Sequence, residues 1–378
     1  MPSRPRRSVA RLAGAALVTV VAIVVAGLLF AWTGVYNVAA SRGHWAIVEW
    51  LLTFVMRNSV ETHSLAIATP PLDDPDLVRL GAAHFHGGCA PCHGAPGIPI
   101  GPIAQHMLPP PPNLATAASQ WKDRELFWIA KHGIKYTGMP SWVSQQRDDE
   151  VWAVVAFLKR LPSLGSQNYH ELAMGNVQLT QQTGREIATK DATAEAVSAC
   201  ARCHGADDRP PQSALVPILH GQPVEFLFAA LRAYADGKRE SGIMQPIAAD
   251  LTPEAMRQVT DYYSGLTRPR VQATPQADNA AAVESGRVLA THGAPAAEIP
   301  PCLSCHGAEA LNTYPRLAGQ HAAYMQGQLR LWKRGLIPRT ETGAIMAPIA
   351  QRLSDRQIED IAAYFASDEP SSGTAQRP

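Results

Sequence analysis

The hydrophobic and polar positions divide the chain into a strongly apolar N-terminal part and a longer remainder of short, helix-spaced segments. Residues 12–32 carry no charge and are rich in Val, Leu, Ala and Ile, and they follow a run that contains Arg4, Arg6, Arg7 and Arg11. That length is enough to cross a bilayer as one helix. Arginine on the N-terminal flank predicts a cytoplasmic start and an outward-facing remainder. We therefore expect a single-pass membrane anchor.

A cleaved signal peptide is the competing interpretation of this N-terminal part. Val38-Ala39-Ala40 has the small-x-small pattern of a cleavage site. The apolar run is longer than the usual hydrophobic region of a signal peptide, which has about 7–15 residues, and this favours a retained helix. The sequence leaves open whether the chain is cleaved after Ala40.

A second apolar stretch, residues 45–56, lies between Arg42 and Arg57 and contains Glu49. It is too short to cross a bilayer. It is expected either to lie in the outer interface, or on a membrane partner, or to pack as a connecting helix on the next domain. The sequence does not separate these interpretations.

Downstream, the apolar residues recur at helical spacing, and no segment shows the alternation that is typical of a strand. Helices that carry aromatic residues are predicted at 148–161, 253–266 and 355–367. Gly81, Gly184 and Gly286 each lie in a shorter helical pattern upstream of one of these helices. Because glycine has no side chain, we expect the aromatic helix of each domain to cross closely there. The predicted fold class is all-α.

These patterns divide the chain into five segments. We expect an N-terminal anchor and interfacial helix at residues 1–66, three consecutive domains at 67–165, 166–270 and 271–370, and a tail at 371–378. Residues 162–182 and 267–278 are predicted to be polar joins between domains. The Ser-, Gly- and Pro-rich end of the chain, from residue 368, is predicted to be disordered.

Composition limits the classes of function. The chain has 378 residues, enough for two or three domains. A net charge of +1 gives no reason to expect nucleic acid or a strongly charged substrate. Aromatic residues make up only 7%, which is low for a self-sufficient core of this size. Large buried cofactors would supply the missing apolar bulk.

One motif, C-x-x-C-H, uses all six cysteines of the chain. It occurs as Cys89/Cys92/His93, Cys200/Cys203/His204 and Cys302/Cys305/His306. This motif is typical of c-type haem attachment. Two thiols one helical turn apart can each form a thioether to a haem vinyl group, and the adjacent imidazole then ligates the iron. The sequence therefore predicts three covalently bound haem c groups.

Zinc and redox dithiol sites are the alternatives for a lone C-x-x-C pair. A zinc site needs four convergent ligands. Here the pairs lie about a hundred residues apart, and each has its own histidine. Haem is therefore favoured over zinc.

The sixth iron ligand is predicted from a repeat in the second and third domains. The segment from Pro217 to Gln222, P-I-L-H-G-Q, matches P-R-L-A-G-Q from Pro315, and Met244-Q-P-I-A matches Met346-A-P-I-A. A methionine thioether raises the potential relative to a second imidazole and closes the sixth position to substrate.

Three other sets of residues bear on the iron sites. In the first domain, Met139 of T-G-M-P is the predicted ligand and Met107 is its competitor. The carbonyls of Pro112, Pro217 and Pro315 are predicted to accept a hydrogen bond from the iron-binding histidines, because such a histidine usually donates its second ring N–H. Five further histidines could replace methionine on iron, but are expected at the surface or at a haem edge: His84, His86, His132, His220 and His321.

These residues resemble those of class I cytochromes c. Residues 180–368 are similar to the two-domain, di-haem members of bacterial periplasms, through C-A-R-C-H-G and C-L-S-C-H-G with their shared downstream motifs. The first domain resembles a more general single-haem domain, through C-A-P-C-H-G and T-G-M-P. The resemblance implies His/Met-ligated haems with exposed edges, electron transfer as the activity, and haem domains on the periplasmic side of the bacterial inner membrane.

The function expected is that of a membrane-anchored tri-haem cytochrome that carries single electrons along a respiratory chain, toward a haem-copper terminal oxidase. Its partners would then be that oxidase and a quinol-oxidising complex. The alternative is the electron-accepting subunit of a periplasmic alcohol, aldehyde or sugar dehydrogenase. An enzyme that reacts at an open haem is disfavoured by the three methionine candidates, so we expect an electron carrier with no catalytic residues of its own.

Overall fold

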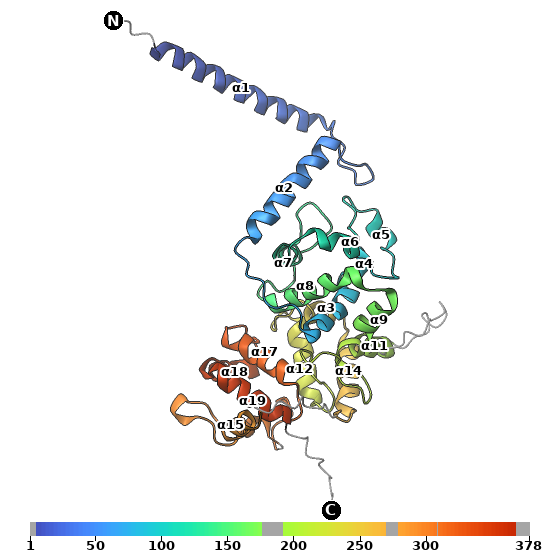
Figure 1. Ribbon diagram of the computed structural model, residues 1–378, viewed down its shortest axis with the longest axis vertical. Helices are drawn as coiled ribbons and strands as arrows, with labels where there is room; N and C mark the ends of the chain where they lie inside the picture. Colours follow the sequence, from blue (N-terminus) through green and yellow to red (C-terminus); the bar gives the residue numbers. More distant parts are fainter. Residues whose placement is uncertain (1–4, 176–191, 270–278, 308, 368–378) are drawn as a thin grey trace, which may run out of the picture.

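The computed structural model describes residues 5–175, 192–269, 279–307 and 309–367. Within these ranges all regular elements are helices, and the only strand-like features are three single bridges between nearby residues. The all-α class predicted from the sequence is therefore confirmed. The chain forms an N-terminal arm and three groups of helices, here called the first, second and third units (Figure 1).

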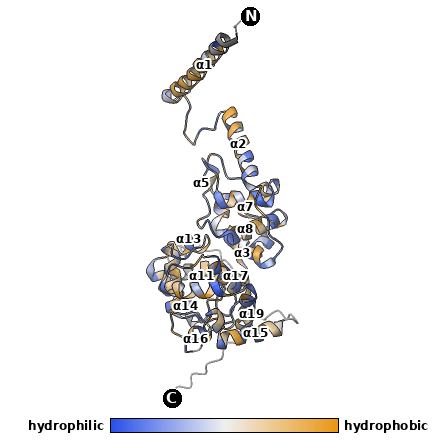
Figure 2. Cartoon of the chain, turned by 90° about the vertical axis from the view of Figure 1, so that its left-hand side faces the viewer, coloured by the Kyte–Doolittle hydropathy of each residue, from blue (hydrophilic) through white to orange (hydrophobic). Residues whose placement is uncertain are grey.

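The arm consists of α1 (Pro5–Thr33) and α2 (Ala46–Ser64), which extend away from the rest of the chain (Figures 1 and 2). Within residues Arg11–Thr33 an 18-residue window has a mean hydropathy of 2.7 and no buried residue, so α1 is long and apolar enough to cross a membrane. The ring of Trp45 closes the elbow between the helices, with its centroid 5.2 Å from that of Tyr36.

α2 has a bare half and a packed half. Ile47, Trp50 and Phe54 in its first turns are 53–66% exposed. Near its end Val60 is buried, and the guanidinium of Arg57 lies 4.9 Å from the ring of Trp121, just before α7 of the first unit. The packed half thus fits the connecting-helix interpretation, whereas the bare half has no covering element among the described residues.

The first unit is centred on the crossing of α3 and α8. A Cβ atom at Gly81 of α3 would collide with the carbonyl oxygen of Ala153 in α8, so this crossing requires glycine. Phe85 and Phe157 pack beside it with their ring centroids 5.0 Å apart. The helices of this unit are α3 (Pro75–Gly88), α4 (Ala90–His93), α5 (Pro102–Gln105), α6 (Leu114–Ala117), η1 (Ala118–Gln120), α7 (Asp123–His132), α8 (Asp148–Arg160), η2 (Leu161–Ser163) and α9 (Ser166–Met174).

Helix α9 lies where the sequence predicted a polar join. Its Tyr169, Ala173 and Met174 are buried in the core of the first unit, and the hydroxyl of Tyr169 lies 3.0 Å from Nδ1 of His86. These three residues lie on one face of the helix, and their burial outweighs the polar residues between them. The boundary placed between residues 165 and 166 stays a prediction, although α9 packs with the helices that precede it.

The second and third units repeat one plan. The second unit has α11 (Ala192–His204), α12 (Val224–Ala235), α13 (Met244–Ala249) and α14 (Pro253–Gly265). The third has α15 (Asn279–His292), η3 (Pro295–Ala297), α16 (Leu303–His306), α17 (Ala322–Lys333), α18 (Glu341–Arg352) and α19 (Asp355–Ser367).

The glycine crossing recurs in the third unit, where a Cβ at Gly286 of α15 would collide with the carbonyl oxygen of Asp360 in α19. The crossings predicted at Gly81 and Gly286 are thus confirmed. Gly184 and the tail from residue 368 lie outside the described residues.

Candidate haem-binding sites

All three C-x-x-C-H motifs have the same local geometry. Each histidine ends a short helix or the last turn of a longer one: α4, α11 or α16. Its Nδ1 lies 2.8 Å from the carbonyl oxygen of Pro112 in the first unit, 3.0 Å from that of Pro217 in the second and 2.9 Å from that of Pro315 in the third. A carbonyl can only accept, so Nδ1–H donates and the lone pair of Nε2 stays available for a metal.

Burial sets the protonation of these groups. It lowers the pKa of His93, His204 and His306, against the raising effect of the hydrogen bond to the proline carbonyl. The imidazoles are therefore neutral near pH 7, which is the form that binds a metal. Burial also raises the pKa of the Cys89 thiol to about 12. Among the described residues no group of three or more His, Cys, Asp or Glu is placed to hold a metal ion.

One cavity of about 1240 Å³ connects two of the three motifs. Its lining includes Cys200, Cys203 and His204 from the second unit and Cys302 and His306 from the third. Most of its surface is apolar, contributed by side chains such as Phe226, Leu227, Val259, Leu329, Ile349 and Phe365. Pockets for a single drug-sized ligand usually measure about 300–1,000 Å³. The cavity therefore suits a pair of large flat apolar groups.

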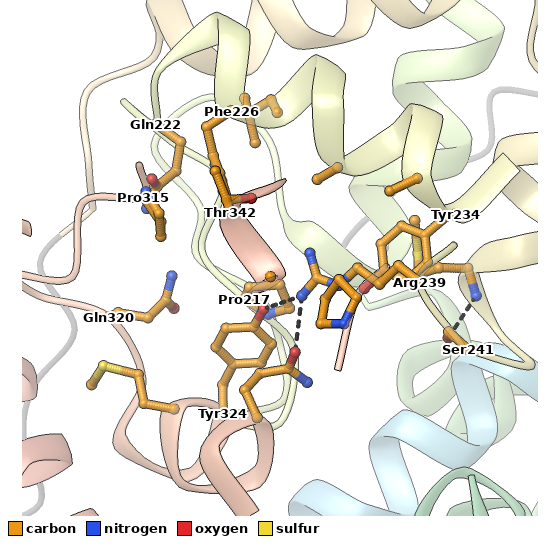
Figure 3. Close-up of a pocket in the computed structure, with 18 of the residues that line it drawn as sticks. Pro217, Gln222, Phe226, Tyr234, Arg239, Ser241, Pro315, Gln320, Tyr324 and Thr342 are labelled. Carbon is orange, nitrogen blue, oxygen red and sulfur yellow. Dashed lines mark hydrogen bonds between the residues drawn. The ribbon is translucent and has the colours of Figure 1, made fainter. Parts of the chain in front are cut away.

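Several charged residues line the cavity: Arg147, Glu150, Lys238, Arg239, Arg316 and Glu341. Figure 3 shows the guanidinium of Arg239 directed toward Tyr324. It lies 4.8 Å from the ring of Tyr234 and donates hydrogen bonds to Tyr324 Oη at 3.3 Å and Gln328 Oε1 at 2.9 Å. No carboxylate among the described residues forms an ion pair with it. A cation in an apolar cavity requires an anionic partner. Haem carries carboxylates, so the residues present fit haem in charge as well as in shape.

Met244 and Met346, the predicted axial methionines, both line this cavity. Met244 is the first residue of α13, and Met346 lies in the second turn of α18. In the first unit, Met139 lies in the loop between α7 and α8, and its N–H donates to Thr137 Oγ1. The sulfur of Met107 lies against Gly138 of the same loop, so both candidates of this unit are adjacent and Met139 stays a prediction.

Two of the other histidines, His220 and His321, do not lie at the surface, which was one of the two positions predicted for them. His220 is fully buried, His321 is 7% exposed, and neither lines the cavity. Both lie at the contact between the second and third units, where Nδ1 of His321 is 3.0 Å from the carbonyl oxygen of Val216. His84, His86 and His132 keep some exposure, and the ring of His84 packs edge-on against Trp142.

Two glutamines of the repeat tie the second and third units together, a role that the sequence analysis missed. Gln222 donates to the carbonyl oxygen of Arg316 at 2.8 Å and accepts from its N–H at 2.9 Å. Gln320 does the same to Ile218, at 3.1 and 2.9 Å. Ile218 and Arg316 directly follow the prolines that bind the motif histidines. Their identical place in both repeats was the signal that could have revealed this reciprocal pair.

Comparisons with known proteins find relatives for each end of the haem-motif region. Residues 76–158 match the family model described as cytochrome c oxidase, cbb3-type, subunit III, and residues 294–368 match that of cytochrome c. The thiosulfate dehydrogenase electron acceptor of Stutzerimonas stutzeri is 34% identical over 195 residues, which cover 51% of this chain and 89% of that protein. The cytochrome c4 of Thiocapsa roseopersicina is 32% identical and covers 46% of this chain and 88% of its own.

Solved structures give matches of similar extent. A cytochrome c4 from Acidithiobacillus ferrooxidans is 30% identical with a TM-score of 0.40, over 44% of this chain and 97% of its own. A thiosulfate dehydrogenase from Marichromatium purpuratum is 31% identical with a TM-score of 0.42, over 50% of this chain and 41% of its own.

The sequence relatives are matched over most of their length, yet they account for only about half of this chain. Its six cysteines, arranged as three pairs, are consistent with three covalently bound haems. The chain therefore belongs to the class I cytochromes c, as a multi-haem electron carrier whose relatives are the di-haem cytochromes c4 and the electron acceptors of thiosulfate dehydrogenase.

Proposed function

We propose that this chain is a membrane-anchored, periplasmic tri-haem cytochrome c that passes single electrons between redox proteins, toward a haem-copper terminal oxidase. The observation that carries the proposal is the single apolar cavity lined by two attachment motifs. Two haems enclosed together would form one path for an electron, and the first unit would supply a third. The match of residues 76–158 to a subunit of a cbb3-type oxidase supports an oxidase as the acceptor.

In this proposal each unit is one cytochrome domain with one haem. The covalent attachment points are Cys89, Cys92, Cys200, Cys203, Cys302 and Cys305. The axial pairs are His93 with Met139, His204 with Met244, and His306 with Met346.

The haem iron supplies the one-electron chemistry, and the residues of the chain set its conditions. Each proline carbonyl holds one imidazole in the tautomer that leaves Nε2 free. Each methionine closes the sixth position, so the chain carries electrons rather than binding a substrate at iron. Arg239 offers its charge to the acidic side chains of the haems in the shared cavity.

The first test is the number of covalently attached haems. Intact mass and haem staining of purified protein should show three. Replacing Cys302 and Cys305 together by Ala should leave two, and replacing Cys89 and Cys92 should do the same. A wild-type mass that corresponds to fewer than three haems would overturn the tri-haem assignment.

The second test concerns location. Protein in the membrane fraction that resists a carbonate wash and retains the N-terminal residues supports the anchor. Soluble periplasmic protein that begins after Ala40 supports the signal peptide instead.

A second candidate function is the electron acceptor of a periplasmic dehydrogenase. The relatives named as thiosulfate dehydrogenase electron acceptors favour it, with an inorganic sulfur donor in place of the alcohols, aldehydes or sugars suggested by the sequence alone. Stopped-flow reduction of the oxidised protein separates the two. Fast reduction by thiosulfate with its dehydrogenase supports this candidate, whereas fast reduction by a quinol-oxidising complex and fast oxidation by a haem-copper oxidase support the first.

A further inference from the structure

The junction between the first and second units contains a buried carboxylate, Glu150, which also lies in the wall of the shared cavity. Glu150, in the first turn of α8, is 3% exposed. Its Oε1 accepts from the guanidinium of Arg147 at 2.9 Å and from the hydroxyl of Ser241 at 2.5 Å. Its Oε2 accepts from the N–H of Gly242 at 2.6 Å and from the indole of Trp142 at 3.3 Å. Two of these four partners belong to the second unit.

The hydroxyl of Ser241 links Glu150 to the backbone of Met244 by hydrogen bonds. The serine hydroxyl donates to Glu150, and its oxygen accepts from the N–H of Met244 at 3.0 Å and from that of Ile243 at 3.3 Å. Met244 opens α13, and an N–H in the first turn of a helix has no partner within the helix. The carboxylate of one unit therefore holds, through one hydroxyl, the backbone of the methionine in the next.

Packing at the same place allows little freedom. A Cβ at Gly242 would collide with the indole of Trp142, so the ring lies directly on the backbone of the methionine loop. Ile243 packs against the apolar core of the first unit. Arg147 donates to the carbonyl oxygen of Glu240 at 2.9 Å, on the other side of Ser241.

The corresponding loop of the third unit contacts another unit farther from its methionine, where the N–H of Arg339 donates to the carbonyl oxygen of Lys238 at 2.7 Å and its guanidinium donates to that of Gly237 at 2.6 Å. Gly343 lies three residues before Met346, as Ser241 lies before Met244. Its N–H donates to the hydroxyl of Thr340 at 3.1 Å, which caps α18 from within the same unit. Ile345, the counterpart of Ile243, is 46% exposed. The two copies thus differ in the turn just before the methionine: a hydroxyl of the same unit binds Gly343, whereas a carboxylate of the first unit binds Ser241 and Gly242.

We propose that the first unit completes the axial-methionine site of the second unit, with Glu150 as a positioning residue that acts through Ser241 on Met244. The methionine ligation of the second haem then depends on the docked first unit, whereas that of the third haem does not. This inference rests on the proposed function, because it takes Met244 to be an iron ligand.

The experiment uses the full-length protein with its haems attached. Met244→Ala is the reference, Glu150→Ala and Ser241→Ala are the tests, and Ser241→Thr restores the hydroxyl. Asp149→Asn is the matched control, because this neighbouring carboxylate also pairs with Arg147 but is 46% exposed and does not contact the loop. The readouts are the methionine-to-ferric-iron charge-transfer absorption, carbon monoxide binding by the reduced protein, and a redox titration.

Met244→Ala should remove about one third of the charge-transfer absorption, because one of three haems loses its methionine, and carbon monoxide should bind that haem. Glu150→Ala and Ser241→Ala should weaken the same share, admit carbon monoxide at the same haem and lower one of the three potentials, while Ser241→Thr and Asp149→Asn stay near wild type. Ser241→Ala leaves the Arg147–Glu150 pair intact, so it decides the question even if Glu150→Ala does not fold.

Two results would overturn the inference, and they differ. If Met244→Ala loses its share while Glu150→Ala and Ser241→Ala keep theirs and exclude carbon monoxide, Met244 is the ligand but needs no help from the first unit. If Met244→Ala itself changes nothing, the ligand assignment in the proposed function fails, and the inference fails with it.

Discussion

The hydrogen bonds that Gln222 and Gln320 form between the second and third units are neutral and reciprocal, and each binds the backbone beside the proline of the other unit. The contact between the first and second units, here called the charged junction, is built instead on the buried pair of Glu150 and Arg147, which binds the methionine loop of the second unit. That loop returns a different group, the carboxylate of Glu240, which accepts from the hydroxyl of Ser144 at 2.9 Å. A duplicated domain can bind its copy with one motif used twice, but a foreign domain needs side chains of its own.

The difference also affects robustness. Replacing both partners of a neutral amide pair can be nearly neutral, but removing one partner of a buried ion pair leaves an uncompensated charge. The charged junction between the first and second units should therefore be more sensitive to mutation and to low pH than the glutamine contacts.

The largest effect is expected from Gly242→Val, which breaks the charged junction sterically. The new side chain would occupy the position of the Trp142 indole. Overpacking of this kind costs roughly 3 kcal/mol. Denaturant unfolding should show this loss, and small-angle scattering should show a larger radius of gyration. An unchanged radius and midpoint would mean that the indole does not seal the junction.

A smaller effect is expected from the two glutamines between the second and third units. Gln320→Leu leaves the N–H and carbonyl of the fully buried Ile218 without a partner, at a cost of about 1–3 kcal/mol in unfolding free energy. Gln222→Leu removes the same two bonds from Arg316, but Arg316 is exposed and its carbonyl oxygen also accepts from Arg268 at 3.3 Å, so the loss should be smaller.

Gln326→Leu, at an exposed hydrogen bond of α17, serves as the control and should stay within about 0.5 kcal/mol. An equal or larger loss for Gln222→Leu than for Gln320→Leu would contradict this ranking.

Acid should weaken the charged junction through His84. Burial, with a further contribution from the charge of Arg202, lowers the pKa of His84 from 6.5 to about 4 in the folded chain. The unfolded chain takes up the proton first, so the stabilisation is complete above about pH 6.5 and is lost as the pH falls toward 4. His84→Phe keeps a ring against Trp142 and should reduce the fall in unfolding free energy over this range by roughly 1–2 kcal/mol. Equal pH slopes in the two proteins would exclude this role.

The smallest expected effect is a gain in unfolding free energy, at a glycine that serves as the reference for Gly242→Val. Gly327 lies in the exposed interior of α17, with nothing within 4 Å of a new Cβ. Gly327→Ala should raise the unfolding free energy by about 0.5–1 kcal/mol, because alanine loses less backbone entropy in a helix. A loss measured here would show that glycine replacement is harmful in this chain even without a collision.

Local patterns in the sequence were sufficient for the helices and for much of the histidine geometry. The aromatic helix predicted at 148–161 ends one residue earlier, and Gly81 and Gly286 lie at the expected crossings. These features depend on residues within one unit, where spacing along the chain determines contact. The proline carbonyls lie beside the motif histidines for the same reason.

The features that the sequence analysis missed depend on contacts between distant parts of the chain. Glu150 lies in an acidic first turn, which is typical of a solvated helix start, and its burial comes from residues 241–242. Arg239 has no basic counterpart in the third unit, where Glu341 occupies the aligned position, so the repeat could not reveal it. Tyr169 is buried because α9 folds back onto α3, which no local pattern indicated.

The stem formed by α2 has a mechanical consequence. A helix of 19 residues is about 28 Å long and behaves as a rod, and the packed end of α2 fixes it to the first unit. With α1 in a bilayer, the three units would move together with α2 as a rigid body that pivots at Trp45, and not as domains on a flexible linker. The three units could then contact only those membrane proteins that lie within the arc of this movement. The distance of a partner's docking surface from the membrane would therefore decide binding as much as the chemistry of that surface.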